Sequence, residues 1–171
     1  MGAGKTTVGR ELSQSLGWQF IDLDDVVVRR ANQSVPEIFA SEGEAGFRKR
    51  ESQALQEVLA ASAENATVIA LGGGAYVQGA NFELIRRSGC RTFHLDADLE
   101  TLMARCKTEG NTRPLLQDEN HFRQLYVARQ SSYMKADHRI DTAGKSVREI
   151  VTEIMLQLGI SNELRQKSGT R

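Results

Sequence analysis

Cysteine, proline and histidine are scarce in this sequence of 171 residues, which contains two, two and three of them, respectively. Cys90 and Cys106 form no C-x-x-C pair and have no histidine-rich segment beside them, so we expect reduced thiols and neither a disulfide framework nor a zinc site. Charge of one sign is not in excess either, because 22 basic residues balance 22 acidic ones. This balance argues against a protein that binds nucleic acid through its phosphates, whereas a small anion needs only a local cluster of cations.

Long apolar runs are missing as well. No segment approaches the roughly 20 apolar residues of a membrane-spanning helix, and the pattern of a secretory leader is not seen. We therefore expect a soluble, cytoplasmic and monomeric protein that has no membrane partner. The length is that of one domain with a single sizeable core.

A glycine-rich segment at the start of the sequence is its most informative feature. It matches the last part of the phosphate-binding pattern G-x-x-x-x-G-K-[ST] with Gly2, Ala3, Gly4, Lys5, Thr6 and Thr7. In such a loop the backbone N–H groups and a helix N-terminus face the anion, the lysine reaches the β- and γ-phosphates, and the hydroxyl can hold Mg²⁺. An ordinary glycine turn is the alternative. Residues 6–16 favour a nucleotide site, because they have the pattern of the helix that such a loop feeds.

Short β-rich segments alternate with helical ones along the rest of the chain. This alternation predicts an α/β fold with a parallel sheet. The apolar segment 67–71 is expected to be a strand buried on both faces, the long polar segment 108–120 a lid, and residues 161–171 a frayed tail. The expected strands are 19–22, 67–71, 91–95 and 138–141, and the expected helices are 5–16, 25–31, a short one capped by Ser34, 43–61, 81–87, 98–107, 122–135 and 147–158.

Two candidate ligand-binding segments directly follow expected strands. Ligands of open α/β sheets bind at the carboxyl ends of the strands. Asp22 and Asp24 end one strand, so one acid could serve a metal and the other a substrate hydroxyl. For this pair taken alone, an ordinary turn in which Asp24 or Asp25 caps a helix is the favoured interpretation. Three glycines, residues 72–74, end another strand. They favour close approach of a ligand to the backbone over a plain turn.

Several arginines could bind a carboxylate or a phosphate, because the planar guanidinium forms two parallel hydrogen bonds with such groups. Arg48 and Glu51 are three residues apart on one expected helix face and can pair. A solvated surface salt bridge is the alternative for that pair. Arg113 precedes a proline in the expected lid, and Arg129 lies in the middle of a helix near Tyr133.

Taken together, these motifs resemble shikimate kinase. The resemblance rests on the glycine-rich start, Asp22-x-Asp24, the Phe-Arg-x-x-Glu pattern of residues 47–51, the three glycines, and Arg-Pro-Leu-Leu at 113–116, in this order, and it covers residues 1–158. It implies a three-layer P-loop kinase fold in one domain, residues 1–160, with a five-stranded parallel sheet. Substrate-binding helices would occupy about 23–62 and a lid about 107–120.

The resemblance also implies a reaction, in which ATP phosphorylates the 3-hydroxyl of shikimate and yields shikimate 3-phosphate for chorismate and aromatic amino-acid biosynthesis. The implied catalytic residues are Lys5, Asp24 and Arg113. The implied shikimate-binding residues are Asp24, Arg48, Glu51, Gly73, Gly74 and Arg129. The implied ATP-binding residues are Gly2, Ala3, Gly4, Lys5, Thr6, Thr7, Arg105 (or Lys107) and Arg113, and Mg²⁺ would be held by Thr6 and, through water, by Asp22.

Two other functions remain open at this point. One is a gluconate-type kinase of the same superfamily, because gluconate also carries a carboxylate and hydroxyls. The other is a non-catalytic protein with the same fold that binds a ligand or a partner. The Phe-Arg-x-x-Glu pattern followed by three glycines favours shikimate.

One departure from the family pattern concerns the central strand of the sheet. The sequence contains neither the first glycine of the phosphate-binding pattern nor the strand that precedes it, so the strands ending at Leu71 and Leu95 should lack the neighbour between them. Each unpaired buried backbone group costs about 1–3 kcal/mol, and a domain has only about 5–15 kcal/mol of net stability. We therefore expect a truncated form that is poorly stable or inactive.

Overall fold

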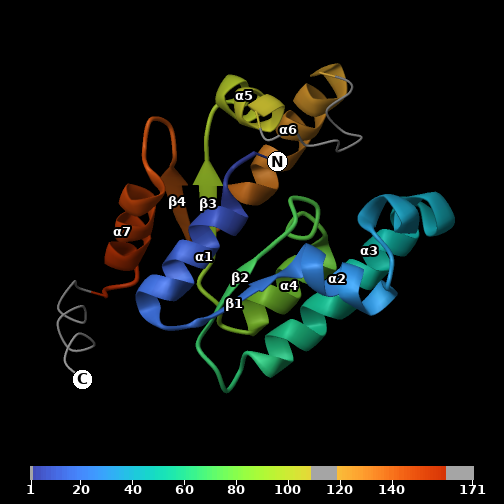
Figure 1. The fold of residues 1–171 in the computed structure, drawn as a ribbon, viewed down its shortest axis with the longest axis horizontal. Helices are drawn as coiled ribbons and strands as arrows, with labels where there is room; N and C mark the ends of the chain where they lie inside the picture. Colours follow the sequence, from blue (N-terminus) through green and yellow to red (C-terminus); the bar gives the residue numbers. More distant parts are fainter. Residues whose placement is uncertain (1, 109–118, 161–171) are drawn as a thin grey trace.

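The computed structural model describes residues 2–108 and 119–160, in which helices and strands alternate as expected. Figure 1 shows helices packed around two separate pairs of strands. The elements in order are α1 (Lys5–Leu16), β1 (Gln19–Asp22), α2 (Leu23–Ala31), α3 (Val35–Ala61), β2 (Thr67–Ala70), α4 (Gly79–Arg87), β3 (Phe93–Asp96), α5 (Leu99–Thr108), α6 (Glu119–Tyr133), β4 (His138–Asp141) and α7 (Val147–Gln157).

The helix after the glycine-rich loop has the predicted bounds. Gly4, with φ of 74°, forms its N-cap, and Gly17, with φ of 68°, ends it by donating its N–H to carbonyls of the last turn. Both residues occupy the left-handed region that glycine adopts without steric cost. The loop and its helix are thus fixed by two glycines that the sequence places at the two ends.

The start of α2 differs from the expectation. The helix begins at Leu23 and not at Asp25, because the Asp22 carboxylate accepts the N–H of Asp24 at 3.1 Å and caps the helix. The interpretation in which Asp24 or Asp25 is the cap is wrong. Asp24 therefore lies in the first turn of α2, beyond the strand.

The two helices expected on either side of Gly43 form one bent element. Ser34 and Glu37 make a capping box at its start, as the sequence indicated. Gly43 has φ of 68° and ψ of −175°, so the helix is interrupted there. The second half carries Phe47, Arg48 and Glu51.

The strands pair in parallel as two separate two-stranded sheets, β1 with β2 and β3 with β4. The prediction that the strands near Leu71 and Leu95 lack a common neighbour is confirmed within the described part of the chain. The prediction that segment 67–71 is buried on both faces is wrong: β2 ends at Ala70, and only Ala70 in it is buried, with the three preceding residues half-buried. A cavity beside β2, described below, is the physical reason.

The buried apolar side chains gather in three clusters. One joins α2, α3 and α4 around Leu23, Ile38 and Leu55. A second joins α1, β4 and α7 around Val8 and Ile140. The third comprises Ala97, Leu102, Cys106 and Phe122 and packs against Ala3. The chain before α1 therefore lies where the second and third clusters meet, since Ala3 contacts both.

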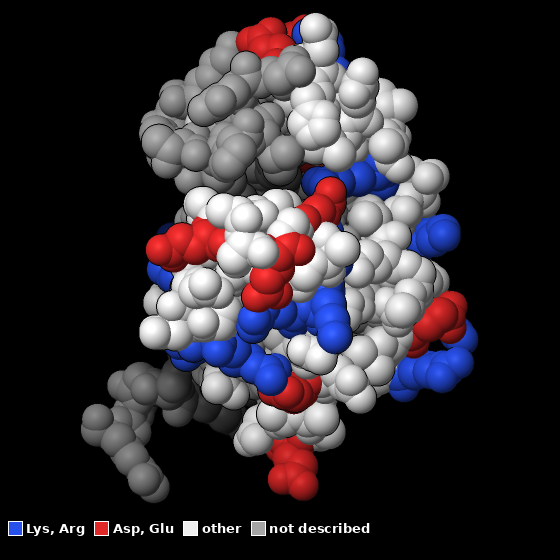
Figure 2. Space-filling view, turned by 90° about the vertical axis from the view of Figure 1, so that its right-hand side faces the viewer, with Lys and Arg blue, Asp and Glu red and all other residues white. Residues whose placement is uncertain are grey.

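The surface carries both signs of charge. On the face that bears α2 and α3, acidic and basic side chains lie side by side (Figure 2). Exposed pairs such as Arg30 with Glu57 and Arg50 with Glu42 account for part of this mixture. Among the helices of residues 2–108 and 119–160, none combines the length and apolar character needed to cross a membrane.

Candidate active site

The glycine-rich loop and the end of β1 are joined by a direct hydrogen bond. The hydroxyl of Thr6 donates to the Asp22 carboxylate at 2.8 Å, so the two residues predicted to serve a metal are in contact. Both offer hard oxygen atoms, the type of ligand that Mg²⁺ prefers. The described residues hold no cluster of three histidine, cysteine or acidic side chains suited to a metal. The donor set thus fits a Mg²⁺ ion that takes its remaining ligands from phosphate and water.

Two of the three glycines after β2, Gly72 and Gly74, are packed against charged side chains. A Cβ atom on Gly72 would lie 2.8 Å from an Asp24 oxygen and 3.0 Å from a Glu51 oxygen, and one on Gly74 would overlap the Arg48 guanidinium. The turn therefore needs glycine because site side chains press on its backbone. This requirement is a role that the sequence reasoning missed.

Arg48 and Glu51 form a buried pair. Nη1 of Arg48 donates to Glu51 at 2.9 Å, and Glu51 is only 1% exposed. Gln78 donates to the same carboxylate oxygen at 2.8 Å. Burial raises the pKa of Glu51, while the hydrogen bond and charge of Arg48 oppose this shift. The alternative of a solvated surface salt bridge is excluded for this pair.

The other edge of the Arg48 guanidinium is also occupied. Its Nε and Nη2 atoms donate to one oxygen of Glu44, at 3.3 and 3.0 Å. Glu44 is an exposed residue one helical turn before Arg48, with 67% of its side chain in solvent. The sequence analysis missed it, although its spacing of four residues from Arg48 was a usable signal. Gln78 had no such signal, because it lies 27 residues from Glu51.

Helix α6 reaches the same glycine turn through Tyr133. The phenol donates to the carbonyl of Gly73 at 2.7 Å. Burial raises the pKa of Tyr133, and a hydrogen bond and the charge of Arg129, together with the charge of Arg48, oppose that shift. Arg48 and Arg129, which are 81 positions apart in the sequence, thus both act electrostatically on one phenol.

A continuous series of contacts therefore links the first turn of α1 to α6. It runs from Thr6 to Asp22, then from Asp24 through Gly72 to Glu51, and from Arg48 through the glycine turn to Tyr133 and Arg129. Lys5 lines a cavity that also includes Gly72, Gly73 and Arg129.

Other predicted site residues lie elsewhere or outside the description. The Arg105 guanidinium donates to the hydroxyl and carbonyl of Thr142 at 2.9 and 2.8 Å, and so holds the chain after β4. Its proximity to adenine stays a prediction. A Cβ on Gly2, whose φ is 66°, would lie 2.7 Å from the Leu102 carbonyl. Arg113 and most of the predicted lid lie outside the described residues, as does the tail 161–171.

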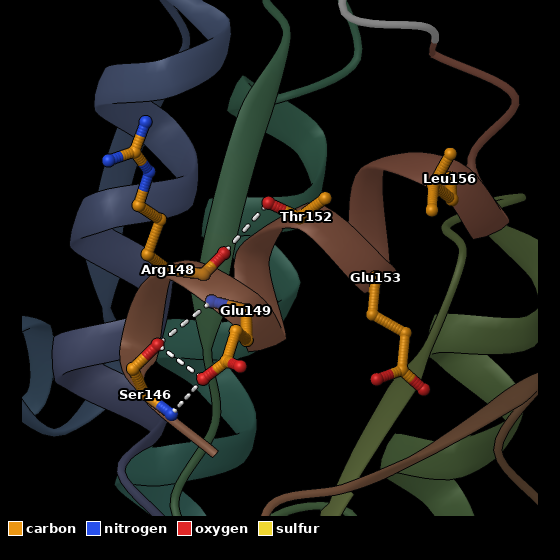
Figure 3. A pocket seen from close by; sticks show the side chains of 6 residues that line it. All are labelled: Ser146, Arg148, Glu149, Thr152, Glu153 and Leu156. Atoms are coloured by element: carbon orange, nitrogen blue, oxygen red, sulfur yellow. Dashed lines mark hydrogen bonds between the residues drawn. The ribbon is translucent and has the colours of Figure 1, made fainter.

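A second hollow, of about 490 Å³, lies on the outer surface of α7 (Figure 3). Its polar groups are used locally: the N–H and hydroxyl of Ser146 both donate to Glu149, and Lys145 donates to Glu153 at 2.6 Å. None of the predicted site residues lines this hollow.

The loop with Lys5 and Thr6 at the start of a helix, on a parallel α/β frame, defines a P-loop kinase. A sequence profile described as shikimate kinase matches residues 1–159. The chain is 44% identical to a shikimate kinase from Symbiobacterium thermophilum, with 92% of this chain and 91% of the relative covered. This chain belongs to the shikimate kinase family, which consists of phosphotransferases.

Solved structures agree with this assignment. A shikimate kinase from Acinetobacter baumannii, determined in complex with shikimate, superposes with a TM-score of 0.84 at 39% identity, over 96% of this chain and 90% of that one. A gluconokinase from Sinorhizobium meliloti 1021 reaches a TM-score of 0.62 at 16% identity, covering 99% of this chain and 93% of that one. The second likeness shows a shared fold alone.

Proposed function

We propose that this protein transfers the γ-phosphoryl group of ATP to the 3-hydroxyl of shikimate. One observation carries the proposal: Asp24 and Arg48 contact Gly72 and Gly74, the two ends of a single three-residue turn. A carboxylate that can accept the hydrogen bond of a hydroxyl and a guanidinium that can bind a carboxylate thus lie against the same turn. Shikimate carries both of these groups. The monomeric state and cytoplasmic location expected from the sequence belong to the same proposal.

The side chains have distinct tasks in this reaction. Lys5 binds the transferring phosphoryl group, whose negative charge is spread over its oxygens in a loose transition state. Asp24 accepts the hydrogen bond of the attacking hydroxyl and fixes its direction. Arg48 and Arg129 bind the shikimate carboxylate, and Glu51 holds the Arg48 guanidinium by the 2.9 Å hydrogen bond. Catalysis then depends mainly on positioning and on charge.

The remaining groups complete the proposal. Thr6 and, through water, Asp22 would hold Mg²⁺, which neutralises phosphate charge when bound. Gly73 and Gly74 would offer backbone N–H groups to shikimate. Arg113 would approach the γ-phosphate from the lid, and Arg105 the adenine.

A coupled assay of ADP release tests the proposed substrate. With ATP and Mg²⁺ present, shikimate should give turnover and gluconate should give none above the hydrolysis background. The gluconate alternative is not favoured, because shikimate kinases are 44% and 40% identical to this chain over 92% and 96% of its length. Turnover with gluconate alone would contradict the proposal, and ATP binding without turnover on either acid would support the non-catalytic alternative.

Removal of the Glu44 carboxylate should strengthen shikimate binding. Glu44 occupies the Nε and Nη2 edge of Arg48, so it must leave this edge before a substrate carboxylate can bind there. An exposed ion pair is worth about 0–1 kcal/mol. We therefore expect Glu44→Gln to lower the KM for shikimate about twofold to fivefold with kcat unchanged.

The KM for ATP serves as the internal control for this variant, because Glu44 lies on the Arg48 side of the site. Glu42→Gln is the matched control, since Glu42 pairs with Arg50 and not with Arg48. A KM for shikimate that rises in Glu44→Gln would show that Glu44 helps to orient Arg48 and does not compete with the substrate.

A further inference from the structure

The carbonyl groups of the glycine turn and of the residue after it all accept hydrogen bonds. The carbonyl of Gly72 accepts the N–H of Ala75 at 3.0 Å, which closes the turn. The next three carbonyls accept from side chains: the phenol of Tyr133 at Gly73 (2.7 Å), the amide of Gln78 at Gly74 (3.5 Å) and the amide of Asn81 at Ala75 (3.1 Å). Consecutive glycines have no side chains that restrict φ and ψ. Contacts from outside the turn must therefore fix the directions of its peptide groups.

The bond from Tyr133 sets the direction of the Gly74 N–H group. The described chain contains no cis peptide bond, and in a planar trans peptide the C=O and N–H groups point in opposite directions. Because the Gly73 carbonyl points at the phenol on α6, the Gly74 N–H points away from it. Within residues 2–108 and 119–160 this N–H has no hydrogen-bond partner. It is one of the two N–H groups assigned above to shikimate.

The neighbours of Tyr133 hold its phenol in place. The ring packs against His94, with 5.1 Å between ring centroids, and against the apolar cluster around Leu55. Arg129, one turn earlier on α6, acts on the phenol through a hydrogen bond and its charge. Since a guanidinium has donors only, the phenol oxygen accepts from Arg129, and its own proton is left for the Gly73 carbonyl. Burial raises the pKa of Tyr133, so the phenol keeps that proton.

We propose that Tyr133 is a positioning residue of the acceptor site, whose hydroxyl holds the Gly73–Gly74 peptide so that the Gly74 N–H is directed at shikimate. The phenol acts through the backbone of the turn and needs no contact with shikimate or ATP. This role differs from the direct contacts assigned to Asp24 and Arg48. The inference rests on the proposed function, because shikimate is the ligand that would use this N–H group.

Tyr133→Phe tests this role in the full chain, because it keeps the ring and its packing and removes only the hydroxyl. With ATP and Mg²⁺ present, we expect the KM for shikimate to rise about threefold to tenfold, the range of one lost hydrogen bond. The KM for ATP should stay unchanged, since the hydroxyl bonds to the glycine turn and not to the phosphate loop. A lower Tm with an unchanged KM for shikimate would overturn the inference, because the hydroxyl would then serve the fold alone.

Tyr126→Phe is the matched control. Tyr126 lies two turns before Tyr133 on the same helix, and its hydroxyl also donates to a backbone carbonyl, that of Ala97, at 3.5 Å. This carbonyl is not part of the glycine turn, so the KM for shikimate should remain unchanged. An equal rise of this KM in both variants would overturn the inference, because loss of either hydroxyl on α6 would then disturb the site.

Amide hydrogen exchange separates a failure of this inference from a failure of the proposed function. The N–H of Ala75 closes the turn onto Gly72, so its exchange reports on the turn without any substrate. In Tyr133→Phe we expect exchange at Ala75 to become about fivefold faster or more, with exchange at Val8, whose N–H bonds to Gly4, unchanged.

Two outcomes of this measurement are decisive. If the unaltered chain does not phosphorylate shikimate, the proposed function fails, and faster exchange at Ala75 in Tyr133→Phe still supports Tyr133 as the residue that holds the turn. Unchanged exchange at Ala75 would overturn the inference whether or not shikimate is the substrate, because the hydroxyl would then not fix the turn.

Discussion

Asp24→Asn should lower kcat for shikimate phosphorylation about 10²–10⁴-fold, the range typical of a lost acid–base or proton-accepting group. Asp24 lies against Gly72 and two residues after Asp22, the partner of Thr6. It is thus placed between the phosphate loop and the Arg48–Glu51 pair. Asparagine keeps the shape of the side chain and removes the negative charge that orients the attacking hydroxyl.

Steady-state kinetics and a separate measurement of ATP binding distinguish this role from others. The affinity for ATP should remain unchanged, because the proposed contact of Asp24 is with the acceptor hydroxyl and belongs to the transition state. Asp25→Asn is the matched control, since Asp25 is the neighbouring acid and is exposed. A loss of ATP affinity with kcat preserved would contradict the assignment of Asp24.

Glu51→Ala should lower the free energy of unfolding by about 3 kcal/mol. Removal of one member of a buried ion pair costs about 3–5 kcal/mol because the other charge remains without its partner. The lower end applies here, since the Arg48 side chain is 23% exposed and keeps Glu44 as a second partner. Gln78 loses its acceptor as well. This loss is a large part of the stability of an ordinary domain.

Urea unfolding checks this prediction through the midpoint and slope of the transition. Glu44→Ala, which removes the exposed partner of the same arginine, should cost at most about 1 kcal/mol. Glu51→Gln should lose less than Glu51→Ala, because a carbonyl oxygen remains for Arg48. Equal midpoints for Glu51→Ala and Glu44→Ala would show that the buried pair contributes no more than the exposed one.

The glycine turn explains why these residues act together. Asp24 and Glu51 lie against Gly72, Tyr133 donates to Gly73, and Arg48 lies against Gly74. Any side chain at Gly72 or Gly74 would separate the charged groups that the turn brings together. Side chains from three helices therefore contact one short segment of backbone.

Local features could be predicted because neighbouring residues fix them. Gly4 and Gly17 bound α1, and Ser34 with Glu37 forms a capping box whose spacing is visible in the sequence. The pairing of Arg48 with Glu51 was likewise visible as a three-residue spacing. The start of α2 was not, because three acids, Asp22, Asp24 and Asp25, could each cap a helix there, and the structure uses Asp22, whose other oxygen accepts the hydroxyl of the distant Thr6.

By itself, the sequence determined the family and the order of helices and strands, since both depend on local spacing and motif order. Only the tertiary structure decided that Gln78 completes the Glu51 pair, that Tyr133 joins α6 to Gly73, and that β2 is half-buried. Those features depend on which surfaces pack together across long stretches of chain. Burial and hydrogen bonding between such distant groups are set by the whole fold, so short-range sequence patterns do not predict them.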